Sequence, residues 1–135
     1  MVIAGKRSAV EAAIVAMKSA GAKIATLLAM SVPSHCYLML PAADRLREKL
    51  ETVTFYAPKI PVINNADVMS ETSPEKIKEA LVKQLYSPVR WVETIQYMIA
   101  HDVKTFVECG PGKVLTGLNK RISREVETVS VTGNR

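Results

Sequence analysis

Short segments with the composition of β-strands alternate with longer amphipathic segments along this chain, and this alternation constrains its fold more than any other feature. The strand-like segments are residues 1–4, 23–30, 62–65, 105–108 and 126–131. In the segments between them apolar residues recur every three or four positions, which is typical of a helix with one buried face; these are residues 7–20, 38–50, 72–85, 92–99 and 114–122. Strands alternating with helices of this length predict an α/β fold, with a parallel sheet covered by helices.

The apolar positions of these helices predict the core. In the second helical segment the residues expected to face inward are Ala42, Ala43, Leu46 and Leu50. In the fourth they are Val92, Ile95, Met98 and Ile99. Aromatic residues make up only 5% of the chain, so the core must be built mainly from aliphatic side chains.

Several residues predict where helices begin and where the chain turns. Gly21 follows the first helical segment and is expected to be its C-cap glycine. Thr72 and Glu75 have the spacing of a capping box, and Pro74 between them suits the first turn of a helix. Residues 110–112 (Gly-Pro-Gly) predict a tight turn between a strand and the last helix.

The predicted sheet begins and ends abruptly. The first strand has no helix before it, and the last has no element after it. Because both faces of a parallel sheet are normally covered, we expect the chain to be cut from a larger fold and to expose apolar faces.

Charge excludes some functions and favours others. The chain of 135 residues carries a formal net charge of +5, which favours an acidic partner. Lysines and arginines are scattered rather than clustered on one segment, so no nucleic acid partner is expected.

The longest apolar stretch, residues 24–30, is too short to span a bilayer, so no membrane association is expected either. Because Lys6 and Arg7 precede any long apolar run, we expect no signal peptide and a cytoplasmic location.

The two cysteines, Cys36 and Cys109, lie far apart and form no Cys-x-x-Cys pair. They are expected to be buried free thiols in a reducing compartment. Together with His35 and His101 they are too few and too dispersed for a typical metal site, so no metal is expected.

His35 is the candidate catalytic residue. It follows an apolar segment and the break at Pro33, so it is expected as a buried base just after a strand end, where α/β folds carry reactive groups. Histidine exchanges protons near neutral pH, as a general base must. However, no serine of the chain stands in a Gly-x-Ser-x-Gly setting, which would expose a nucleophilic hydroxyl. A base without a nucleophile indicates part of an active site.

Two carboxylates are candidates to orient His35. Asp67 and Glu108 are the ones nearest to predicted strand ends, and the residues alone do not choose between them. Residues 110–113 (Gly-Pro-Gly-Lys) lack the spacing of a phosphate-binding loop, although Lys113 could still meet an anion at the start of the last helix.

Five motifs, in order and with matching spacing, resemble one family over nearly the whole chain. They are residues 31–36 (SVPSHC), 41–44 (PAAD), 61–67 (PVINNAD), 84–91 (QLYSPVRW) and 110–118 (GPGKVLTGL). The family is the bacterial malonyl-CoA:acyl carrier protein transacylase of type II fatty-acid synthesis. Its members transfer a malonyl group from coenzyme A to the thiol of acyl carrier protein through an acyl-serine.

The resemblance implies a fold and a site. It implies an α/β-hydrolase-like core with an inserted ferredoxin-like subdomain: residues 1–31 would be the end of that small subdomain, and residues 32–135 the C-terminal part of the core. His35 matches the family's catalytic general base and acid. Gln84 matches the residue whose backbone carbonyl orients that histidine, which makes a role for Asp67 or Glu108 unnecessary. No cofactor is implied; malonyl-CoA is a substrate and acyl carrier protein a partner.

Three features of the family have no match in this sequence. They are the Gly-His-Ser-Leu-Gly nucleophile motif, the arginine that binds the malonyl carboxylate and the glutamine of the oxyanion hole, all expected upstream of Met1. We therefore expect a truncated fragment, or one half of a split acyltransferase whose N-terminal half carries the nucleophile, inactive alone. The alternatives are a non-catalytic module that binds carrier protein and, with least support, a basic nucleic-acid binder.

Overall fold

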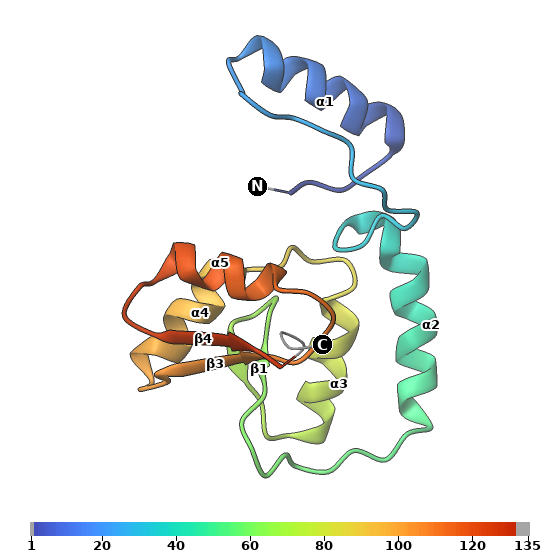
Figure 1. Cartoon of the computed structure of the whole chain (residues 1–135). Coiled ribbons are helices and arrows are strands. Elements are labelled where there is room, and N and C mark those ends of the chain that lie inside the picture. Colours follow the sequence, from blue (N-terminus) through green and yellow to red (C-terminus); the bar gives the residue numbers. More distant parts are fainter. Residues whose placement is uncertain (1, 132–135) are drawn as a thin grey trace.

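The computed structural model describes residues 2–131, which form an α/β structure (Figure 1). Its helices are α1 (Arg7–Ser19), the short 3-10 helix η1 (Tyr37–Met39), α2 (Leu40–Glu51), α3 (Pro74–Lys83), α4 (Trp91–Ala100) and α5 (Val114–Ile122). Its strands are β1 (Ile63–Asn64), β2 (Met69–Ser70), β3 (Thr105–Glu108) and β4 (Glu127–Ser130). The predicted α/β class is confirmed, and each predicted helical segment contains a helix.

The predicted parallel pairing is found at the C-terminal end of the described chain. β3 and β4 pair in parallel, with Phe106 opposite Thr128, whereas β1 and β2 form a small antiparallel pair. α5 connects β3 to β4 and packs on both strands (Figure 1). Thr116 of α5 is buried against this sheet, since its hydroxyl group lies 3.5 Å from the backbone oxygen of Val129. The sheet therefore has one face covered by a helix of this chain.

A second packing unit joins α2 to α3. Ala43 and Leu50 of α2, both predicted to face inward, are buried together with Val82 of α3, which the sequence pattern did not single out. Leu46, Phe55, Leu81, Leu85 and Tyr86 pack around them. This cluster fixes the C-terminal end of α3 beside the first turns of α2, and thus beside His35.

The start of α3 differs from the predicted capping box by one residue. Ser73, not Thr72, is the N-cap: its hydroxyl oxygen accepts from the backbone N–H of Lys76 at 3.5 Å. Because Pro74 follows, the backbone of Ser73 is held in the extended conformation that an N-cap requires. Pro74 occupies the first turn as predicted.

Turn predictions from glycine are confirmed at two positions. Gly21, just after α1, has a φ of +91°, and Gly112 before α5 has a φ of +88°. Such backbone angles are open to glycine at no steric cost.

The two N-terminal strands are not formed, and this part of the fold prediction is wrong. Residues 2–4 and 23–30 lie outside any strand, while Met1 lies outside the described residues. A strand must place its backbone N–H and C=O groups against a neighbouring strand, and residues 2–131 offer these segments none. Ile24 is 83% exposed as a result.

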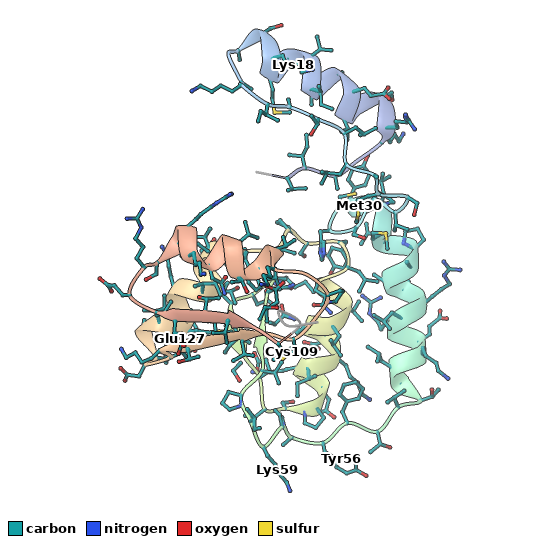
Figure 2. The ribbon with its side chains drawn as sticks, in the orientation of Figure 1. Lys18, Met30, Tyr56, Lys59, Cys109 and Glu127 are labelled. Carbon is teal, nitrogen blue, oxygen red and sulfur yellow. The ribbon has the colours of Figure 1, made fainter. Side chains whose placement is uncertain are left out.

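α1 stands apart from the rest of the molecule (Figure 1). None of its residues is buried. Figure 2 shows the side chains around Lys18 extending into open space, and Met30 where the returning segment meets the top of α2.

Apolar faces are exposed elsewhere too, as the abrupt sheet predicts. Val92, expected to face inward on α4, is 51% exposed, although Ile95 on the same helix is only 1% exposed. Val107 and Val129, on neighbouring strands, are exposed in the same way. The whole structure exposes 10178 Å², whereas a compact monomer of this mass exposes about 7,000 Å². The chain thus has much more uncovered surface than its size requires.

Candidate active site

His35 is held by two consecutive carbonyl groups beyond the end of α3. Its backbone N–H donates to the oxygen of Leu85 at 2.9 Å, and its ring Nδ1 lies 2.9 Å from the backbone oxygen of Gln84. Since a carbonyl oxygen can only accept, Nδ1 is the donor, and in the neutral form of the ring the lone pair is therefore on Nε2. The geometry therefore leaves Nε2 free to take a proton from another group.

The backbone at His35 is unusual. Its φ of +62° lies in the left-handed region, which few residues other than glycine adopt, although histidine does so more often than most. Such a conformation persists only where the surroundings hold it, and it is concentrated at functional sites. Here the two carbonyl contacts hold it.

The surroundings of His35 differ from the prediction in two respects. The residue is exposed rather than buried, and it follows an irregular segment rather than a strand. The segment 23–30, which precedes the loop of His35, pairs with no strand among residues 2–131.

Neither carboxylate proposed from the residues contacts His35. Asp67 instead forms an ion pair with Lys83 of α3. Glu108, at the end of β3, accepts hydrogen bonds at the start of α5 from the backbone N–H groups of Leu115 and Thr116, at 3.1 and 2.8 Å. The Thr116 hydroxyl donates to the same carboxylate at 2.7 Å. Glu108 therefore caps α5 and does not orient the histidine.

Glu108 makes stability depend on pH. The hydrogen bonds from Thr116 and then from Leu115 hold its pKa below the ordinary value of 4.5. Its stabilising effect is therefore fully present above that ordinary pKa and is lost as pH falls through the lower pKa of the folded protein. Glu108→Gln is expected to lower the urea midpoint at neutral pH and to flatten its decline in acid. Glu125→Gln, at an exposed glutamate, is the control; equal curves for both variants would contradict this assignment.

The position of Glu108 also bears on whether an anion could bind near Lys113 at the start of α5. A hollow of about 400 Å³ lies between α5 and β4, lined by Lys113, Thr116, Lys120 and residues 128–131. The N–H groups at the start of α5 that would hold an anion are already bonded to the Glu108 carboxylate. The structure thus gives the anion hypothesis no support.

The cysteines are more accessible than predicted. Cys36 is half-buried, with its Sγ 3.2 Å from the backbone oxygen of Pro33, and Cys109 is exposed. Both are free thiols, as expected, but the prediction that they are buried is wrong.

Within residues 2–131 no three His, Cys, Asp or Glu side chains gather in a way that could hold a metal ion. No helix in the same range has the length and apolarity to cross a membrane.

An apolar groove of about 420 Å³ lies next to the candidate site. Its lining includes Phe55, Tyr56, Ile63, Leu81, Gln84 and Trp91. The side-chain oxygen of Asn65, which also lines it, is buried without a hydrogen-bond partner among the described residues. Gln84 thus lines the groove and directs its backbone oxygen to His35. Tyr56 and Lys59 lie at the outer edge of the molecule in Figure 2.

The chain is similar in fold to part of acyl carrier protein S-malonyltransferases. A crystal structure of that enzyme from Vibrio cholerae superposes with a TM-score of 0.90 at 58% identity, covering 94% of this chain and 42% of that one. A malonyl-transacylase in complex with a type II PKS acyl-carrier protein superposes with a TM-score of 0.92 at 52% identity, covering 96% and 42%.

The curated relatives specify the homology. The chain is homologous to malonyl CoA-acyl carrier protein transacylase, with 57% identity to the Escherichia coli K12 protein over 122 residues. This match includes 90% of the chain but 40% of the relative, so the chain spans about two fifths of that protein's length. No protein-family model matches the sequence.

Proposed function

We propose that His35 is the general base and acid of malonyl transfer from coenzyme A to acyl carrier protein in fatty-acid biosynthesis. The observation that carries this proposal is the 2.9 Å contact between Nδ1 of His35 and the backbone oxygen of Gln84. It supports one ring tautomer and one ring orientation, with Nε2 as the proton acceptor. No cofactor takes part, and the reaction takes place in the cytoplasm.

The proposed reaction has two halves that use the same nitrogen. Nε2 takes the proton of a serine hydroxyl as its oxygen attacks the thioester carbon of malonyl-CoA, and then gives the proton to the departing sulfur of coenzyme A. In the second half it takes the proton of the carrier-protein thiol as that sulfur attacks the acyl-serine. It then returns the proton to the serine oxygen.

The orienting group is a neutral carbonyl dipole rather than a carboxylate. It fixes the tautomer and direction of the ring, as the aspartate does in a Ser-His-Asp triad. It stabilises the protonated imidazole less, because it carries no full negative charge. The alignment of the ring is therefore its main contribution.

We further propose that the serine lies on another polypeptide or segment, and that the 135 residues alone do not turn over malonyl-CoA. The chain has no Gly-x-Ser-x-Gly sequence, and the loss of one triad member costs several powers of ten in rate. The excess exposed surface, about 3,000 Å² over a compact monomer, exceeds the roughly 800 Å² that one partner buries in a standard interface. In the assembled enzyme, residues 32–135 would belong to a hydrolase-like core and residues 1–31 to a ferredoxin-like subdomain.

Reconstitution tests this proposal. The chain is co-expressed with the part of the Escherichia coli relative that it does not match, and malonyl transfer to holo acyl carrier protein is measured. Activity is expected only when both polypeptides are present. Turnover by the chain alone, or a purified complex of both polypeptides without activity, would show that the proposal is wrong.

A second candidate function rests on charge. The net charge of +5 would speed the encounter with an acidic carrier protein, so the chain alone could bind it without catalysis. Titration of the chain with holo acyl carrier protein at low salt tests this, and an absence of binding there would remove it.

A further inference from the structure

The carbonyl that holds His35 is itself supported by a set of contacts between the β1–β2 turn and the last turn of α3. The Asn64 side chain donates from Nδ2 to the backbone oxygen of Ala80 at 3.3 Å. Its Oδ1 accepts from the backbone N–H groups of Ala66 and Asp67, at 2.8 and 3.3 Å. One side chain thus joins the turn to the end of the helix.

A second contact lies next to the residue that orients His35. Nζ of Lys83, the last residue of α3, donates to the Asp67 carboxylate. Gln84 and Leu85, whose carbonyls hold His35, are the next two residues of the chain. Asp67 is therefore linked to His35 only indirectly, through Lys83 and Gln84, although the residue types alone suggested a direct contact.

The same turn is also tied to α4. Arg90, the N-cap of α4, donates its backbone N–H to the oxygen of Asn65 at 2.8 Å, and its guanidinium lies 3.5 Å from the backbone oxygen of Asp67. The β1–β2 turn is thus held in place against α4, and the ion pair of Lys83 with Asp67 holds the end of α3 against this turn.

We propose that Asp67 and Lys83 are positioning residues for His35: their ion pair fixes the backbone at the end of α3 so that the Gln84 carbonyl meets Nδ1. This inference rests on the proposed function of His35. The pair is partly exposed, with Lys83 51% and Asp67 27% accessible at the side chain, so it contributes little to folding stability. The hydrogen bond and the charge of Asp67 raise the pKa of Lys83 above its ordinary value.

The first test observes the ring directly. In the full chain labelled with ¹⁵N-histidine, the His35 ring at a pH where it is neutral is expected to show the Nδ1–H tautomer. In Lys83→Met and Asp67→Asn the signal is expected to shift toward a mixture of tautomers, and in Lys83→Arg to stay as in the parent. The control is Lys76→Met, which removes a lysine of the same helix that faces Glu71 at 3.9 Å.

The second test measures rate in the reconstituted enzyme. A small misplacement of a reacting group can cost about a hundredfold in rate, and partial loss of alignment is expected to lower kcat about tenfold in Lys83→Met. KM for malonyl-CoA should stay unchanged, and Lys83→Arg should restore kcat. Thermal unfolding of each variant, expected near that of the parent, separates this effect from a loss of folding.

The outcomes separate this inference from the proposed function. An unchanged tautomer in both Lys83→Met and Asp67→Asn, or a change of equal size in Lys76→Met, overturns the positioning role even if His35 is catalytic. Full activity of a His35 variant overturns the proposed function, whatever the state of the ion pair.

Discussion

His35→Ala is expected to lower malonyl transfer by the reconstituted enzyme about a thousandfold, within the 10²–10⁴-fold that a positioned proton-transfer group contributes. The substitution removes the proposed proton acceptor, while the polypeptide proposed to supply the nucleophile is unchanged. The measurement is kcat/KM for transfer to holo acyl carrier protein. Because His35 has a φ of +62°, alanine would also strain the backbone. His35→Asn, which tolerates this conformation, is therefore assayed in parallel and should be equally inactive.

Two control variants sharpen this experiment. The ring Nδ1 of His101 lies 2.8 Å from the backbone oxygen of Tyr97, so this histidine is also held by a carbonyl group. His101→Ala therefore removes a ring in a similar setting. It should leave activity unchanged. Gln84→Ala should retain most of the activity, because the group that holds His35 belongs to the backbone. A loss in Gln84→Ala as large as that in His35→Ala would assign the orienting role to the side chain instead.

Ile95→Ala is expected to destabilise the chain by about 2–5 kcal/mol, the usual cost of removing a buried aliphatic side chain. Ile95 is 1% exposed and lies on α4, which packs on α5. Domains are commonly stable by only about 5–15 kcal/mol, so this change removes a large part of the total. Urea unfolding followed by circular dichroism measures it. Val92→Ala, on the same helix but 51% exposed, should change the free energy of unfolding by less than about 0.5 kcal/mol.

The helices could be predicted from the sequence because each carries its own periodic signal. The segment 7–20 corresponds to α1 (Arg7–Ser19), and the segment 38–50 to η1 and α2. Strands were also predicted at residues 1–4 and 23–30, but residues 2–4 and 23–30 form none. A helix satisfies its backbone groups internally, whereas a strand depends on a neighbour, and sequence composition does not say whether that neighbour is present.

The site, too, could be predicted where residue type alone was enough, and not where it depended on contacts between residues far apart in the sequence. His35 could be selected because histidine is a rare and chemically distinctive residue in this chain. Its partner could not be found from residue types, since every residue has a backbone oxygen; only the resemblance to a family pointed to Gln84. Glu108 was a reasonable candidate because it is the last residue of a strand. Its cap on α5 depends on a contact with Thr116 that spacing alone does not reveal.

The uncovered apolar surface has a consequence for the life of this polypeptide in a cell. Exposed aliphatic side chains such as Ile24 and Val92, at 83% and 51%, are what chaperones and proteases recognise in unassembled proteins. In the split enzyme proposed above, the polypeptide that carries the serine would shield these side chains. The abundance of this chain would then follow the synthesis of that second polypeptide, and surplus copies would be degraded.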